Sequence, residues 1–215
     1  MTPRSTERLT IAGPAGKLEI AINAPAGGPR GIALVAHPNP QQGGTLDNKV
    51  AQTLAKTFHA LGYASVRVNY RGVGASEGSF DEGVGETEDM LAALRYAQSR
   101  FAGEATSLGT VLAGFSFGAY VQTRVAKQVQ AQRLVLVGPA VSRFAFDSVP
   151  EDTVVIHGEE DEVVPLSDVL AWARPQQLPI VVFPGGSHFF HGRLLQLQRV
   201  ITSVWQSPPA ISAAA

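Results

Sequence analysis

The stretch Thr110-Val-Leu-Ala-Gly-Phe-Ser-Phe-Gly-Ala-Tyr-Val-Gln-Thr-Arg-Val-Ala126 decides the fold of this chain. It begins with an apolar run at residues 111–113, which is typical of a strand buried on both faces. It ends in a pattern with a spacing of three to four residues, including Val121 and Val125, which predicts a helix. Between the two lies Gly114-Phe-Ser-Phe-Gly118, a G-x-S-x-G pattern at a predicted strand-to-helix junction.

The G-x-S-x-G pattern has a mechanical meaning at such a junction. The chain must turn so sharply that Ser116 adopts a strained backbone conformation with its hydroxyl above the sheet edge. Gly114 and Gly118 allow neighbouring backbone to approach without a Cβ clash. The helix that follows directs its free N–H groups toward any negative charge that develops near the serine. A glycine-rich turn whose serine caps the helix would show the same five letters, so the rest of the chain must decide.

Length and composition indicate one globular α/β domain over residues 1–215. Hydrophobic residues make up 45% of the chain and charged residues 16%, enough for a substantial core. The formal net charge is −1 and no Lys or Arg run stands out, so nothing favours binding to nucleic acid or to a membrane surface. The absence of cysteine excludes disulfides, a cysteine nucleophile and thiolate metal sites.

The ends of the chain and its longest apolar runs predict a cytoplasmic protein. Residues 1–8 are not followed by an apolar secretory segment, and no apolar run reaches the length needed to span a bilayer. We expect the tail at residues 207–215, and residues 208–215 in particular, to lack regular structure.

Strand and helix patterns alternate along the chain after an opening hairpin. Strand patterns at residues 9–13 and 17–23 flank a Gly-Pro-Ala-Gly turn, which predicts an antiparallel hairpin. Thr45 is expected to cap the first long helix. This order predicts a mostly parallel sheet with helices on both faces and ligands beyond the carboxyl ends of its strands. The remaining strands are expected at residues 31–36, 64–70, 133–138, 153–157 and 180–183, and the helices at 46–61, 85–100, 164–172 and 190–205.

A serine nucleophile needs a base, and the base needs a third group that holds its tautomer. On a sheet of this kind the acid follows the serine along the chain and the histidine comes last. His157 precedes the obvious acidic loop and is therefore out of order. His188 lies in the loop after the last strand, where its ring could reach Ser116, whereas His191 is expected in the first turn of the last helix. We therefore favour His188 as the base.

The acid is expected in the loop after the strand that precedes the histidine loop. Asp147 and Asp152 come before that strand and are poorer candidates. A run of carboxylates is usually a solvated loop, but one member at the strand's carboxyl end would fit the geometry. Spacing leaves four candidates open: Glu159, Glu160, Asp161 and Glu162.

An oxyanion hole of backbone N–H groups would complete the site. Phe117, the residue after the nucleophile, supplies one N–H group. The second is expected from the loop after the first parallel strand, where Pro38 and Pro40 have no N–H to give. Asn39 or Gln41 must therefore donate, and the prolines on both sides would hold Asn39 extended.

With these residues in place, the sequence resembles the α/β-hydrolase superfamily, and specifically its small, lidless, dienelactone-hydrolase-like esterases. The resemblance runs from about residue 9 to residue 205. The family pattern G-x-x-D-x-x-V-P implies that Asp161 is the acid, and the resemblance supports His188 as base and Asn39 with Phe117 as oxyanion pair. Many relatives carry a second histidine in place of Asn39, a difference that a backbone donor tolerates. The matching segments are residues 37–50 (HPNPQQGGTLDNKV), 69–78 (NYRGVGASEG), 114–118, 157–165 (HGEEDEVVP) and 187–192 (SHFFHG).

The family often inserts a lid that residues 139–151 are too few to form. The resemblance therefore implies an open site. Arg71 and Asn69, in a neighbouring loop, are expected to brace it by hydrogen bonds. Aromatic side chains are more often core than substrate wall, but four of them are expected around the site: Phe117, Phe144, Phe146 and Phe189.

The resemblance implies a serine esterase that transfers an acyl group to water through Ser116, His188 and Asp161. We expect a small-molecule ester as substrate, no cofactor and no metal ion, and the sequence leaves the oligomeric state open. A thioesterase or acyltransferase with the same residues, or a non-catalytic binding module on this fold, are the alternatives. A metal-dependent hydrolase that uses His37, His157 or His188 lacks any H-E-x-x-H or similar spacing.

Overall fold

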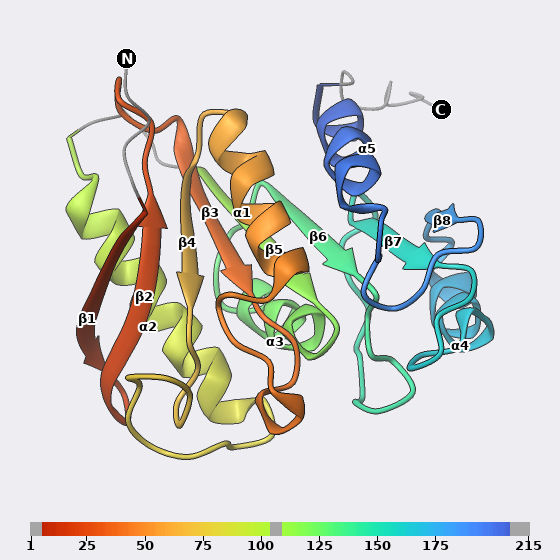
Figure 1. Ribbon diagram of the computed structural model, residues 1–215, viewed down its shortest axis with the longest axis horizontal. Helices are drawn as coiled ribbons and strands as arrows, with labels where there is room; N and C mark the ends of the chain where they lie inside the picture. Colours follow the sequence, from red (N-terminus) through yellow and green to blue (C-terminus); the bar gives the residue numbers. More distant parts are fainter. Residues whose placement is uncertain (1–5, 104–108, 207–215) are drawn as a thin grey trace.

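The computed structural model describes residues 6–103 and 109–206, so the tail expected to lack regular structure lies outside the described residues. Within that part of the chain, eight strands form one sheet in the order β1-β2-β4-β3-β5-β6-β7-β8 (Figure 1). The strands are β1 (Glu7–Gly13), β2 (Gly16–Asn23), β3 (Gly31–Ala36), β4 (Ala64–Val68), β5 (Gly109–Phe115), β6 (Arg133–Val137), β7 (Val154–Gly158) and β8 (Ile180–Phe183).

Pairing in the sheet is mixed, as the sequence predicts. The opening hairpin β1–β2 is antiparallel, and β2 also pairs antiparallel with β4. Every further pair from β4 to β8 is parallel. Parallel strands end at the same edge, so the loops after β3, β5, β7 and β8 meet at one rim of the sheet.

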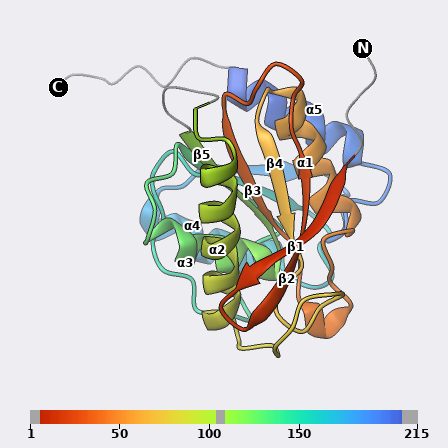
Figure 2. The same cartoon turned by 90° about the vertical axis from the view of Figure 1, so that its left-hand side faces the viewer.

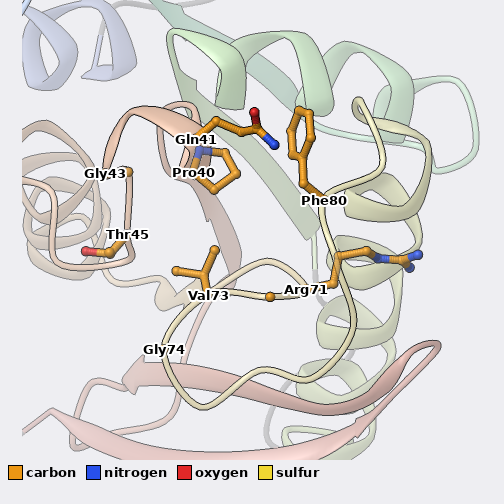
Figure 3. A pocket seen from close by; sticks show the side chains of 10 residues that line it. Pro40, Gln41, Gly43, Thr45, Arg71, Val73, Gly74 and Phe80 are labelled. Atoms are coloured by element: carbon orange, nitrogen blue, oxygen red, sulfur yellow. The ribbon is translucent and has the colours of Figure 1, made fainter.

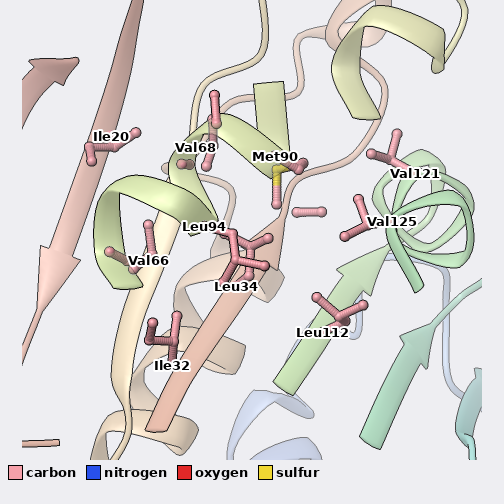
Figure 4. Close-up of a cluster of buried hydrophobic side chains, with 14 of the residues drawn as sticks. Ile20, Ile32, Leu34, Val66, Val68, Met90, Leu94, Leu112, Val121 and Val125 are labelled. Carbon is pink, nitrogen blue, oxygen red and sulfur yellow. The ribbon is translucent and has the colours of Figure 1, made fainter. Parts of the chain in front are cut away.

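Helices cover both faces of the sheet because side chains alternate along the buried strands. On β3, Ile32 and Leu34 belong to the cluster that α2 and α3 cover, whereas Ala33 and Val35 belong to the one under α1 and α5 (Figure 2). Figure 4 shows the first cluster, in which Met90 and Leu94 of α2 and Val121 and Val125 of α3 gather over β3 and its neighbours. The helices are α1 (Lys49–Ala60), α2 (Val84–Arg100), α3 (Phe117–Ala126), α4 (Leu166–Ala173) and α5 (Leu194–Gln206), with short 3₁₀ helices η1 (Pro40–Gln42) and η2 (Arg174–Gln176).

The starts of two helices, α1 and α5, differ by three or four residues from the sequence-based prediction, whereas those of α2 and α4 differ by one or two. Helix α1 is capped by Asn48, whose side chain accepts from the N–H groups of Val50 and Ala51, and not by Thr45. The Thr45 hydroxyl instead accepts from Asp47 N–H in the preceding turn. Apolar spacing placed the helix too early because Leu46 is fully buried although it lies before the helix.

Helix α5 begins at Leu194, four residues later than predicted. Phe190 has a φ of 52°, which interrupts a helix, and its ring packs 5.3 Å from the ring of Phe183. Gly192 also has a positive φ, and the segment between is a turn. His191 therefore lies exposed in this turn and not in a helix.

The connection between β6 and β7, residues 138–153, contains no helix or strand, so the prediction of a lidless architecture is confirmed. In the described part of the chain, no helix is long and apolar enough to cross a membrane.

Candidate active site

Ser116 stands at the sharp turn between β5 and α3. Its backbone has φ 56° and ψ −116°, a region that non-glycine residues rarely adopt, at a cost on the order of 1–3 kcal/mol. Ser116 N–H donates to Val137 C=O of β6 at 2.9 Å, which ties the turn to the neighbouring strand. The strained serine expected from the G-x-S-x-G pattern is therefore present.

The two glycines of the pattern permit contacts between backbone segments. A Cβ on Gly114 would overlap the carbonyl of Gly118, and one on Gly118 would overlap the Ala36 carbonyl and lie 2.6 Å from His37 O. The turn thus packs directly against the end of β3. This contact places the loop after β3 beside the nucleophile.

The structure brings three of the sequence-predicted side chains together in a row. Ser116 Oγ lies 3.1 Å from His188 Nε2, and His188 Nδ1 lies 2.6 Å from Asp161 Oδ2. All three side chains are buried. A carboxylate can only accept, so Nδ1 carries the proton and Nε2 is free to accept the Ser116 hydroxyl proton. The arrangement has the polarity that a serine nucleophile requires.

The carboxylate of Asp161 is held at both oxygens. Oδ1 accepts from Val163 N–H at 2.9 Å and Val164 N–H at 2.7 Å, while Oδ2 accepts from His188. Burial raises the pKa of Asp161, but the hydrogen bonds from His188 and Val164 outweigh it, so the pKa lies below its ordinary value. Asp161 therefore stays charged at neutral pH.

The other carboxylates of the acid loop hold the histidine loop. Glu159 accepts from Gly185 N–H at 2.9 Å, and Glu162 accepts from His188 N–H at 3.1 Å. Gly158 lets the two loops approach, since a Cβ there would come within 2.9 Å of Ser187 O. Sequence spacing could not distinguish these carboxylates because their partners lie 26 residues further along the chain.

The loop after β3 presents a free N–H group near the nucleophile. Asn39 has φ −53° and ψ 119°, the extended conformation expected between two prolines. Its side chain accepts from Gln41 N–H at 2.9 Å, so Gln41 is engaged. Within residues 6–103 and 109–206, the N–H groups of Asn39 and Phe117 donate to no protein acceptor. Both remain available to an incoming oxygen.

His37 fixes this loop, a contribution that the sequence did not reveal. Its Nδ1–H donates to Pro38 C=O at 2.7 Å, its Nε2 accepts from Tyr70 N–H at 3.3 Å, and its ring lies 4.1 Å from the Tyr70 ring. Burial lowers the pKa of His37 to about 4, although the bond to Pro38 opposes the shift. A neutral imidazole thus holds the loop at neutral pH.

The aromatic residues expected around the site occupy different surroundings. Phe117 is fully buried. The ring of Phe144 lies 5.0 Å from the Phe117 ring and stacks on the ring of Tyr120. Phe146 lies 5.6 Å from the ring of Trp172. Phe144 therefore packs against α3, and Phe146 packs against α3 and α4.

Phe189 is the expected wall residue that borders an open cavity. It is 41% exposed, and its ring meets that of His188 edge-on at 5.1 Å. The cavity beside it has a volume of about 410 Å³ and extends between the first turn of α1 and the histidine loop. Its lining consists of Asn48, Lys49, Val50, Phe189, His191, Gly192 and Leu194.

A second cavity of about 400 Å³ lies between the loop after β3 and the loop after β4 (Figure 3). Gln41, Val73 and Phe80 line it, and Phe80 lies 5.6 Å from the Phe117 ring. The Arg71 side chain points away from Gln41 and pairs with the buried carboxylate of Asp89 at 3.0 Å. Arg71 therefore braces the loop, as expected.

Asn69 also braces the rim. Its Oδ1 accepts from Leu46 N–H at 2.8 Å, and its Nδ2 donates to Glu19 at 2.7 Å. These bonds join the segment after β4 to the segment before α1 and to β2, which matches the bracing role expected from the sequence.

Comparison with known proteins identifies the family of this chain. The family model of the X-Pro dipeptidyl-peptidase (S15 family) matches residues 16–155. The structure of an α/β serine hydrolase homologue from Coxiella burnetii is 39% identical, with 94% of this chain and 98% of that chain covered and a TM-score of 0.84. The chain belongs to the S15 family of α/β serine hydrolases. A member without a lid, XC6422 from Xanthomonas campestris, is 34% identical over 97% of this hydrolase and 99% of that chain, with a TM-score of 0.87.

Two further matches place this hydrolase among its relatives. Uncharacterized protein RP471 of Rickettsia prowazekii is 32% identical over 90% of this chain and 86% of its own length. Est1E from Butyrivibrio proteoclasticus, solved with ferulic acid, shares the fold with a TM-score of 0.76 at 17% identity, covering 92% of this chain and 97% of Est1E. None of these matches names the narrower dienelactone-hydrolase-like group, so that likeness stays a prediction.

Proposed function

We propose that this protein is a serine esterase that hydrolyses small carboxylic esters through an acyl-enzyme. The observation that carries the proposal is the buried row of Ser116 Oγ, His188 and Asp161, with distances of 3.1 Å and 2.6 Å. The free N–H groups of Asn39 and Phe117 support it, since such donors stabilise the oxyanion of acyl transfer.

In the proposed reaction, Ser116 Oγ attacks the ester carbonyl carbon while His188 Nε2 takes the hydroxyl proton. Asp161 holds the imidazole and balances its positive charge. The N–H groups of Phe117 and Asn39 bind the negative oxygen. His188 then gives its proton to the leaving alcohol as the C–O bond breaks, and water repeats the cycle on the acyl-enzyme.

The position of His188 predicts which cavity takes which half of the ester. The leaving oxygen must lie within reach of Nε2, so the alcohol belongs on the Phe189 side, where Val50 and Leu194 add apolar surface. The acyl group then belongs on the side of the oxyanion donors. That side holds the cavity between the loops after β3 and β4, which is lined by Gln41, Val73 and Phe80. Volumes of about 400 Å³ and 410 Å³ favour small substrates.

The substrate class has two related alternatives. A thioesterase or an acyltransferase would use the same three residues with another leaving group or acceptor. The proposed cytoplasmic location rests on the sequence alone.

The test is hydrolysis of a p-nitrophenyl ester series, acetate to decanoate, by the wild type and by Ser116→Ala. We expect turnover to fall by about 10⁴-fold or more in the variant. Ser142→Ala, at an exposed serine in a turn, is the matched control and should leave turnover unchanged. Aromatic acyl esters belong in the panel because Est1E binds ferulic acid.

Two outcomes would contradict the proposal. Equal rates for wild type and Ser116→Ala would show that another group carries the activity. Turnover of thioesters or of X-Pro dipeptide amides, but of no oxygen ester, would move the protein to a different substrate class of the same family.

A further inference from the structure

His157 is a buried polar residue that the proposed reaction does not use. It follows the apolar residues Val154 to Ile156 in β7, one position before the strand ends, and it is fully buried. Its Nε2 lies 2.9 Å from Val164 C=O, and a carbonyl can only accept, so Nε2 carries the proton. Nδ1 has no hydrogen-bond partner among the described residues. An orphaned buried nitrogen costs about 1–3 kcal/mol, which argues that this histidine has a purpose besides packing.

The ring lies directly beside the acid of the active site. His157 Nε2 is 3.4 Å from Asp161 Oδ2, the same oxygen that accepts from His188 Nδ1 at 2.6 Å. The carboxylate thus lies between two imidazoles, and Asp161 and His188 are the titratable groups that act on His157.

The bond from His157 also closes the acid loop. It holds Val164 by its carbonyl, and the N–H group of the same residue donates to Asp161 Oδ1 at 2.7 Å. The position of the Asp161 carboxylate therefore depends on Val164, and the position of Val164 depends on His157.

The charge state of His157 suits this task. Burial lowers its pKa, although the bond to Val164 and the charge of Asp161 oppose the shift. A neutral imidazole can orient the loop without cancelling the negative charge that Asp161 presents to His188. A protonated one would also leave a buried Nδ1–H without an acceptor.

We propose that His157 is a positioning residue: its Nε2–H holds the loop of Asp161 closed and keeps Oδ2 against His188. The inference rests on the proposed hydrolase function, because it assigns Asp161 and His188 their roles. It predicts that a donor at the Nε2 position is needed, whereas the imidazole itself is not.

The experiment compares His157→Gln with His157→Asn and His157→Leu. The glutamine amide reaches the position of Nε2, the shorter asparagine amide does not, and leucine offers no donor. We expect His157→Leu and His157→Asn to lose at least tenfold in kcat/KM for a p-nitrophenyl ester and His157→Gln to recover most of it. The acid limb of the kcat/KM–pH profile should move to lower pH in the two impaired variants, since a protonated His188 loses its aligned counter-charge.

The proton NMR signal of His188 Nδ1–H, which donates to Asp161 Oδ2 at 2.6 Å, separates this inference from the proposed function because it needs no substrate. A signal that moves upfield in His157→Asn and returns in His157→Gln supports the positioning role even if no ester is hydrolysed. An unchanged signal and unchanged pH profiles, with only the melting temperature lowered, would overturn it. If His157→Leu does not fold, the Gln and Asn pair still decides the question.

Discussion

The nucleophile and its base are held in place by different means. Ser116 is fixed by backbone alone: the turn packs glycine against backbone carbonyls, and its strained φ is imposed by β5 and α3 on either side. His188 lies in a loop that side chains hold as well as backbone: Glu159, Asp161 and Glu162 each accept from residues 185–188, and Glu160 N–H donates to Gly186 C=O at 2.9 Å.

The difference shows where each half of the site can be altered. A backbone-built turn tolerates no added atom, but it requires no particular side chain besides the serine and its glycines. A loop built by side-chain hydrogen bonds can lose one of them and keep its fold. The following changes test this contrast, from the largest expected effect to the smallest.

Asp161→Asn should have the largest effect on turnover. Asparagine keeps the shape of the side chain, but its amide favours the wrong tautomer of His188 and provides no counter-charge. In a triad such a change costs about 10⁴-fold in kcat. Glu160→Gln, at an exposed carboxylate of the same loop whose side chain has no role in the site, is the matched control and should keep full activity. Comparable losses in the two variants would argue that the whole loop, and not Asp161, is sensitive.

Gly118→Ala should disrupt the turn that holds Ser116. The added Cβ would overlap Ala36 C=O, so the turn and the end of β3 must separate. We expect a loss of about 1–3 kcal/mol in the free energy of unfolding, together with loss of esterase activity. Gly27→Ala, where a Cβ meets nothing within 4 Å, is the control in chemical denaturation. Full activity of Gly118→Ala would refute the claim that this contact sets the nucleophile.

The buried His37 should make stability depend on pH. Its pKa is about 4 in the folded protein and 6.5 in the unfolded chain, so the unfolded chain binds the proton first as the pH falls. The free energy of unfolding therefore drops between about pH 6.5 and pH 4, by up to roughly 3 kcal/mol from this residue. His37→Gln should show a shallower dependence in denaturation at pH 7 and pH 5. If the free energy of unfolding of His37→Gln falls with pH as steeply as that of the wild type, groups other than His37 cause the pH dependence.

Glu162→Ala should have the smallest effect. It removes one exposed acceptor, that of His188 N–H, and leaves Asp161 in place. We expect the transition state to lose about 0.5–1 kcal/mol of stabilisation, which is equivalent to a two- to fivefold drop in kcat/KM. Glu162→Gln can still accept and should recover it. A drop as large as that of Asp161→Asn would show that the side-chain-built loop is as intolerant as the turn.

Sequence patterns predicted the elements well where local geometry decides them. The strand-to-helix turn at residues 114–118 and the extended Asn39 between prolines both follow from steric limits on a few neighbouring residues. The same reasoning failed at Thr45 and Phe190. There, the helix boundary depends on Asn48 as cap and on the packing of Phe190 against Phe183.

By itself, the sequence determined the mostly parallel sheet with its opening hairpin and the candidates Ser116 and His188, because periodicity, turn chemistry and chain order are local or additive properties. Chain order narrowed the acid only to residues 159–162, and the choice of Asp161 came from the resemblance to a known family. Only the tertiary structure decided that Gln41 N–H is engaged and that Asn39 N–H is free. Only it could bring His157 beside Asp161 and show which carboxylates hold the histidine loop. These contacts join atoms from segments far apart in the chain, and their distances are set by how the strands pack, which no pattern along the sequence records.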